Sequence, residues 1–168
     1  GIPIISDDYY GAPRKIEVTK EQAQALKEQG KKTVAITEGN RAHYYYYYPH
    51  DGIDVSAAEG TEVNNILGDG AKVVTIGEDI RLGKYVTLVN KEGTLKVTYG
   101  HLSQILVRGN DKINNLMPLG FVAKAGNAGA AYPHVHIITE KKNSASWVEV
   151  NPISNLELKE LFNNGNSI

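Results

Sequence analysis

The sequence has 168 residues, 41% of them hydrophobic, which is enough for one domain with a sizeable core. Eighteen lysine and arginine residues stand against 19 aspartate and glutamate residues, so the net charge is −1 and no basic patch supports a nucleic-acid partner. Cysteine is absent, which excludes disulfides, thiolate metal sites and a cysteine nucleophile.

The N-terminal part of the chain predicts two strands separated by one helix. Arg14–Val18 reads as extended, after an irregular lead-in. Thr19 and Gln22 form a capping-box pattern, and good helix formers follow until Gly30, which is a natural stop. Lys32–Thr37 then predicts a strand that ends in a turn at residues 38–40.

Five consecutive tyrosines, Tyr44–Tyr48, predict a further strand that ends at Pro49. Alternation along a strand places three rings on one face and two on the other. One interpretation is aromatic packing along a sheet, and the other is a phenolic wall of a substrate cleft.

The rest of the chain predicts a succession of short strands, because 17 glycines separate short apolar runs. Asp69-Gly70 between apolar segments predicts a hairpin that joins strands over Val63–Leu67 and Lys72–Ile76. Strands over Tyr85–Asn90 and Leu95–Tyr99 continue an antiparallel meander. Later segments predict a polar loop at Glu140–Ser146, a short strand at Trp147–Val150 and a final helix over about residues 155–163.

Two histidines one residue apart, His134 and His136, lie in a stretch that predicts a strand. Alternate side chains of a strand share a face, with Cβ atoms about 7 Å apart. One histidine is then able to bind a metal while the other serves as a base in the same cleft. Taken alone, the pattern more often belongs to a solvated strand face, because such pairs arise by chance.

Two further histidines lie beside suggestive neighbours. His50 and Asp54 flank Gly52, and in a straight strand they would lie about 13 Å apart, too far for one metal. Gly52 permits a bend that brings them together. His101 ends the strand that contains Tyr99.

Five ordered motifs run along the chain: His50-x-Gly52-x-Asp54, Gly60-Thr61-x-Val63, Tyr99-Gly100-His101-Leu102-Ser103, Gly126-Asn127-Ala128-Gly129 and Pro133-His134-Val135-His136. In this order and spacing, these motifs resemble the M23 peptidases, also called LytM or lysostaphin-type metalloendopeptidases. The likeness covers about residues 43–153, and Asn151-Pro152 matches the usual end of the domain.

The resemblance implies a mainly β fold, with a small antiparallel core of the LytM or duplicated-hybrid-motif type, a cleft over one sheet and short peripheral helices. It implies one Zn²⁺ bound by His50, Asp54 and His136, with His101 and His134 as the catalytic pair. A zinc site with three protein ligands leaves a position for water, and zinc brings the pKa of that water to about 7. The family often has a tyrosine near the developing oxyanion, for which Tyr44 is the candidate.

The family also implies the substrate, which is a peptide bond in the stem or cross-bridge of bacterial peptidoglycan. Residues 97–102 favour a bond between D-alanine and a diamino acid over a glycyl bridge. One alternative is a non-catalytic or autoinhibited module that binds cell wall or activates another hydrolase. Two more alternatives are a virion component with the same chemistry and a structural β module with incidental histidines.

The expected organisation is an N-terminal extension with one short helix at residues 1–40, a peptidase domain at 41–153, and a C-terminal helix and tail at 154–168. No apolar run approaches the roughly 20 residues of a membrane-spanning helix, and no signal peptide is present. Because the chain begins at Gly1, it reads as a fragment or processed form. Peptidoglycan as partner predicts a place in the cell wall, the periplasm, the medium or a phage virion, and the sequence leaves the oligomeric state open.

Overall fold

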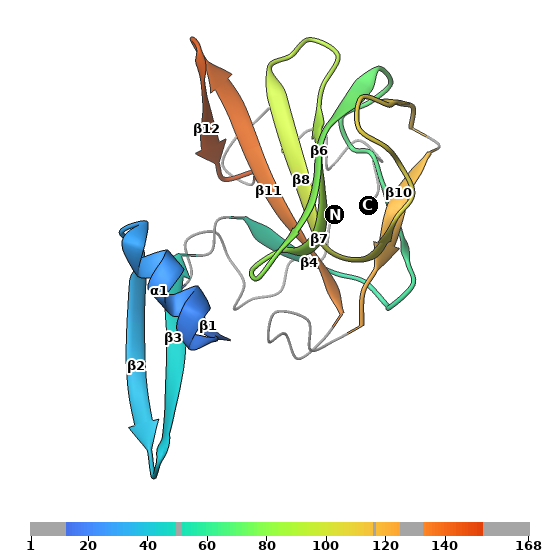
Figure 1. Cartoon of the computed structure of the whole chain (residues 1–168). Helices are drawn as coiled ribbons and strands as arrows, with labels where there is room; N and C mark the ends of the chain where they lie inside the picture. Colours follow the sequence, from blue (N-terminus) through green and yellow to red (C-terminus); the bar gives the residue numbers. More distant parts are fainter. Residues whose placement is uncertain (1–12, 50–51, 116, 125–132, 153–168) are drawn as a thin grey trace.

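The computed structural model describes residues 13–49, 52–115, 117–124 and 133–152 (Figure 1). Within these residues the chain is mainly β-structure with antiparallel strand pairs, as predicted. The strands form two sheets, one of three strands and one of nine. No helix in the described part of the chain has the length and apolar character needed to cross a membrane.

The three-stranded sheet is built from the first described residues. Its order is β1 (Pro13–Val18), β3 (Arg41–Pro49) and β2 (Lys32–Glu38), and α1 (Lys20–Glu28) packs on one face (Figure 1). We call β1, α1, β2 and β3 the N-terminal unit. Because β3 pairs with β1 and β2, residues on both sides of the predicted boundary at residue 41 belong to one sheet. The domain boundaries themselves stay a prediction.

The predicted helix signals of this unit are confirmed. The Thr19 hydroxyl accepts a hydrogen bond from the Gln22 backbone N–H at 3.1 Å, and the Gln22 side chain accepts one from the Thr19 N–H at 2.8 Å. Each bond satisfies a backbone donor that the first helical turn leaves unpaired. Gly30, at a φ of 76°, follows the helix in the left-handed conformation that glycine adopts without strain.

The tyrosine run forms β3 and alternates as predicted. Tyr44, Tyr46 and Tyr48 belong to the hydrophobic cluster of the α1 face, which also includes Val18 and Ala23. The lysines at residues 15 and 32 lie over the rings of the tyrosines at 45 and 47, at 5.0 and 5.4 Å from the ring centroids. The packing interpretation therefore accounts for the run.

The larger sheet follows the path β12-β11-β8-β7-β6-β9, with β4 paired to β11 and β10 paired to both β5 and β8. Its strands, in chain order, are β4 (Ile53–Ser56), β5 (Glu62–Asn64), β6 (Ala71–Asp79), β7 (Gly83–Val89), β8 (Leu95–Ile105), β9 (Lys112–Ile113), β10 (Pro118–Val122), β11 (His134–Asn143) and β12 (Ser146–Val150).

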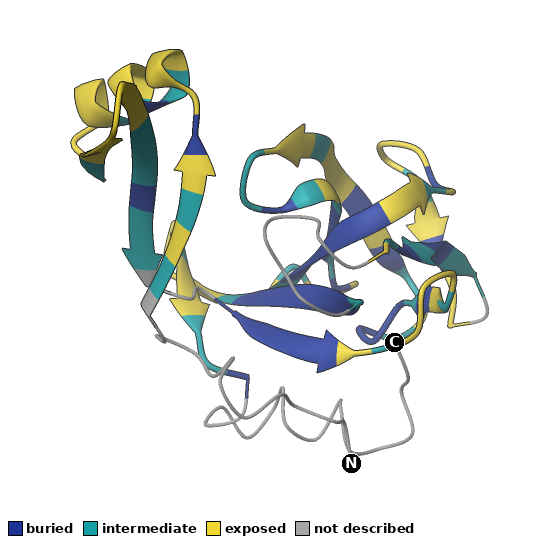
Figure 2. Ribbon diagram, turned by 90° about the horizontal axis from the view of Figure 1, so that it is seen from below, coloured by how far each residue is buried: buried dark blue, intermediate teal, exposed yellow. Residues whose placement is uncertain are grey.

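The main hydrophobic core lies on the strands of this larger sheet, where Figure 2 shows long buried stretches in dark blue. Tyr99 of β8 is fully buried in it, and its hydroxyl accepts a hydrogen bond from the Ile66 backbone N–H at 3.1 Å. Burial raises the pKa of the Tyr99 hydroxyl, because the charged phenolate is poorly solvated there. This bond ties an irregular segment to the strand that carries His101.

Two predictions about the strands are wrong. Asp69-Gly70 forms a turn, but β5 and β6 do not pair across it; β5 pairs with β10, and β6 with β7 and β9. A turn signal reports local backbone shape and not the partner of the strand beside it. The polar stretch Glu140–Ser146 is largely strand, since β11 continues to Asn143 before a tight turn into β12. Charged residues are tolerated there because this end of β11 is exposed.

The meander is confirmed, because β7 pairs with β6 and with β8. The strands predicted near residues 14–18, 32–37 and 147–150 are also present. The helix predicted over about residues 155–163 and the loop Gly126–Gly129 lie outside the described residues.

Candidate active site

Three strands of the larger sheet carry the described candidate residues. Asp54 lies on β4, His101 on β8, and His134 and His136 on β11. β11 pairs with β4 along one edge and with β8 along the other (Figure 1). In these registers His136 stands opposite Asp54 on one side and opposite Gly100 on the other. The sheet therefore brings together side chains that are far apart in the sequence.

Two glycines of the motifs mark places where the backbone is closely packed. A Cβ at Gly52 would lie 1.9 Å from the carbonyl oxygen of Ile137 on β11. A Cβ at Gly100 would lie 3.1 Å from the carbonyl oxygen of Leu82. The chain bends at Gly52, as predicted, but the structure adds a steric requirement: only glycine lets β4 begin so close to β11.

The side chains meet around one carboxylate oxygen. Oδ1 of Asp54 is 2.9 Å from Nδ1 of His136 and 3.6 Å from Nε2 of His134. The His101 ring lies edge-on to both histidines, with centroid distances of 4.7 Å to His134 and 5.8 Å to His136. All four residues are only 5–6% exposed. Buried carboxylates and imidazoles are rare unless they are paired or bind a metal.

The donor atoms fit a zinc ion in kind. Zinc accepts carboxylate oxygen and imidazole nitrogen at about 2.0–2.2 Å, which puts two ligand atoms of a tetrahedral site roughly 3.3–3.6 Å apart. The Asp54 oxygen and the His136 nitrogen, at 2.9 Å, need to separate only slightly to reach that spacing. His50, the third predicted ligand, lies outside the described residues. Among the described residues alone, no group of three such side chains is arranged to hold an ion.

The fifth histidine of the chain and the oxyanion candidate lie elsewhere in the structure. His43 is on β3 and its Nδ1 is 2.6 Å from the Glu17 carboxylate, so it belongs to the N-terminal unit. Tyr44, the candidate for the oxyanion, packs in the hydrophobic cluster beside α1. A cavity of about 490 Å³ lies between the N-terminal unit and the larger sheet, and none of the four clustered residues lines it.

Sequence reasoning missed the backbone groups that hold His101. Its N–H donates to the Leu82 carbonyl at 2.6 Å, and its carbonyl accepts from the Ala123 N–H at 3.0 Å. His101 also has a φ of 60°, which few residues other than glycine adopt. A carbonyl group is common to every residue, so no sequence signal marks Leu82.

Comparison with known proteins finds one matching family. The sequence model for peptidase family M23 matches residues 48–149. No curated protein sequence matches the chain.

Solved structures share the fold. The catalytic domain of lysostaphin from Staphylococcus simulans is 22% identical, with a TM-score of 0.54 over 82% of this chain and 97% of that one. The catalytic domain of the prophage-encoded M23 protein EnpA from Enterococcus faecalis is 24% identical, with a TM-score of 0.52 over 74% and 92% of the two chains. The lytM protein of Ruminococcus gnavus is 16% identical, with a TM-score of 0.57 over 95% and 62%.

The family match covers more than half of the chain, and the resemblance inferred from the ordered motifs is confirmed. The chain belongs to peptidase family M23.

Proposed function

We propose that this protein is a zinc-dependent endopeptidase that hydrolyses peptide bonds in the stem or cross-bridge of bacterial peptidoglycan. The observation that carries the proposal is the buried cluster in which the Asp54 carboxylate lies between two histidines, with a third ring edge-on to both. This arrangement supplies metal ligands and proton-transfer groups within a few ångströms of each other.

In this proposal Asp54 and His136 hold the ion together with His50. A zinc ion bound there would supply a Lewis acid for the scissile carbonyl and a water that ionises near neutral pH. His101 and His134 are the proton carriers, since imidazole has an ordinary pKa of about 6.5 and exchanges a proton readily near neutrality. One of them takes the proton of the attacking water at a ring nitrogen, and the other donates a hydrogen bond to the oxyanion.

Burial strengthens the contacts on which this proposal depends. With the four residues almost fully enclosed, bulk water competes little for their hydrogen bonds, and each electrostatic contact is stronger than at the surface. No residue of the chain has to form a covalent intermediate, because water is the nucleophile.

The family and its structural relatives support the cell wall as the target. Lysostaphin is described as an antimicrobial peptidase and EnpA as prophage-encoded, so a place in the cell wall or in a phage particle fits this chain. A bond between D-alanine and a diamino acid is the first choice of substrate, and a glycyl bridge is the second. The peptidase unit is proposed to span residues 41–153, between an extension and a C-terminal tail.

Digestion of two purified peptidoglycans tests the proposal, one of the diaminopimelate type and one with glycine bridges. Each is incubated with the zinc-loaded protein, with and without a chelator, and the released fragments are identified by mass. We expect chelator-sensitive release from one wall, and the fragment masses name the bond. No release from either wall, with zinc shown to be bound, would refute the proposed activity.

A further inference from the structure

The backbone of His101 is held by a turn that lies outside the M23 motifs. The register of β7 and β8 shifts between Lys84 and Val86, so the regular ladder is interrupted opposite His101. In place of a ladder partner, the Leu82 carbonyl accepts the His101 N–H at 2.6 Å. This contact fixes one peptide group of His101 in its left-handed conformation.

Leu82 is in turn held by one carboxylate. Oδ1 of Asp79 accepts hydrogen bonds from the backbone N–H of Arg81 at 2.9 Å and of Leu82 at 2.6 Å. The Leu82 residue, 6% exposed, therefore donates to Asp79 through its N–H and accepts from His101 through its carbonyl. A movement of the Asp79 carboxylate would therefore displace the His101 backbone through the two hydrogen bonds of Leu82.

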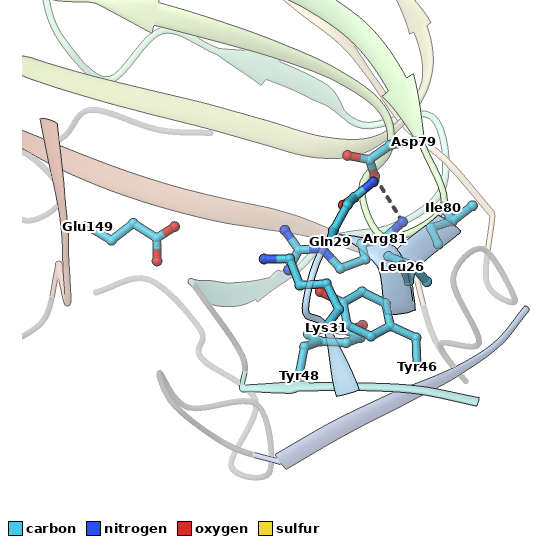
Figure 3. A pocket seen from close by; sticks show the side chains of 9 residues that line it. All are labelled: Leu26, Gln29, Lys31, Tyr46, Tyr48, Asp79, Ile80, Arg81 and Glu149. Carbon is cyan, nitrogen blue, oxygen red and sulfur yellow. Dashed lines mark hydrogen bonds between the residues drawn. The ribbon is translucent and has the colours of Figure 1, made fainter. Parts of the chain in front are cut away.

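The outer side of this turn (residues 80–82) contacts the N-terminal unit. Ile80 packs against the hydrophobic cluster that contains Tyr46, and the Arg81 guanidinium lies 5.0 Å from the centroid of the Tyr48 ring. Figure 3 shows Arg81 and Tyr48 among the side chains that line the cavity between the two parts, with Asp79 hydrogen-bonded to Arg81. The turn is thus in contact with His101 on one side and with β3 on the other.

We infer that Asp79 is a positioning residue for His101, acting through the backbone of Leu82, and that the N-terminal unit holds this turn in place through Ile80 and Arg81. The inference rests on the proposed function, in which His101 is a proton carrier. It gives the N-terminal unit a role in catalysis that requires no contact with substrate. A proton carrier displaced by about 1 Å costs turnover on the order of 10²-fold, so a small movement of the turn is measurable.

The first test compares Asp79→Ala with Asp79→Asn in the zinc-loaded full chain. The asparagine side chain keeps an oxygen that accepts both N–H groups, whereas alanine removes it. We expect kcat of Asp79→Ala to fall at least 10-fold with KM within about threefold of wild type, and Asp79→Asn to recover most of the loss. In Asp79→Ala only, we also expect faster hydrogen exchange of the His101 amide and a shifted NMR resonance of the His101 ring. That resonance is assigned by its absence from the spectrum of His101→Ala.

The second test addresses the N-terminal unit and remains available if Asp79→Ala does not fold. Tyr48→Ala removes the ring beside Arg81, Tyr48→Phe keeps it, and Tyr47→Ala makes the same truncation on the opposite face of β3. We expect Tyr48→Ala alone to lower kcat, by about twofold to fivefold, and to shift the His101 resonance. Identical behaviour of Tyr48→Ala and Tyr47→Ala would refute the role of the N-terminal unit.

The two proposals fail in different ways. An unchanged kcat, amide exchange rate and ring resonance in Asp79→Ala would overturn the positioning role, even if the wild type cleaves peptidoglycan. A wild type that binds zinc but cleaves no wall would overturn the proposed function. In that case the exchange and resonance measurements still decide whether Asp79 holds His101.

Discussion

Replacing Gly52 by alanine should damage both stability and metal binding. The new Cβ would lie 1.9 Å from the Ile137 oxygen and 2.7 Å from its carbonyl carbon, whereas ordinary contacts begin near 3.4 Å. Both atoms belong to the backbone of β11 and cannot rotate away, so β4 and β11 have to separate locally by about 1.5 Å. Overpacking usually costs about 1–3 kcal/mol, and we expect about 3 kcal/mol because a backbone pair has to move.

This separation also acts on the site, because Asp54 and His136 stand opposite each other in the β4–β11 pair. With a melting temperature that falls by about 2–4 °C per kcal/mol in a chain of this size, Gly52→Ala should melt about 6–12 °C below wild type. Thermal unfolding and the zinc content of the purified protein measure the two effects. Gly109→Ala is the matched control, since a Cβ there meets nothing within 4 Å. The reasoning fails if Gly52→Ala melts with that control and binds zinc as wild type does.

The remaining predictions concern the site and the core. Asp54→Ala should lose most bound zinc, whereas His101→Ala should keep its zinc and lose turnover by about 10²–10⁴-fold. Metal analysis measures the first effect and peptidoglycan digestion the second. Full zinc occupancy in Asp54→Ala would contradict the ligand assignment. Tyr99→Phe should lower the free energy of unfolding by about 1–3 kcal/mol in urea titrations, because the buried N–H of Ile66 loses its acceptor. A change below about 0.5 kcal/mol, which is the effect of an ordinary surface substitution, would contradict this prediction. Since burial raises the pKa of the Tyr99 hydroxyl, its contribution to stability is complete below the unfolded value of about 10 and is lost as pH rises above that value. Wild type should therefore lose more stability than Tyr99→Phe between about pH 9 and 11, and parallel losses would show that Tyr99 is not responsible.

The features that the sequence predicted best are those decided by neighbouring residues. The capping box of Thr19 and Gln22 involves one helical turn, and the alternation of Tyr44–Tyr48 follows from strand geometry alone. Pairing is different, because it depends on residues far along the chain. The Asp69-Gly70 turn was predictable, but nothing near it indicates that β5 pairs with β10. The run of tyrosines likewise does not indicate that its partners are β1 and β2.

At the site, the clustering of the side chains was predictable from the sequence, whereas the backbone contacts were not. Ordered motifs predicted that Asp54, His101 and the two histidines of β11 would gather, and the structure brings these four together, while their roles stay proposals. Backbone contacts gave no comparable signal, since the Leu82 carbonyl that accepts from His101 is chemically like any other. The only trace such contacts leave in a sequence is a glycine where a side chain would collide. Gly52 and Gly100 are such positions: Gly52 directly precedes β4, which carries Asp54, and Gly100 lies within β8 next to His101. The spacing of the motifs therefore records where backbones must touch as well as where side chains react, which is why substitutions at these glycines should impair the site without removing a reactive group.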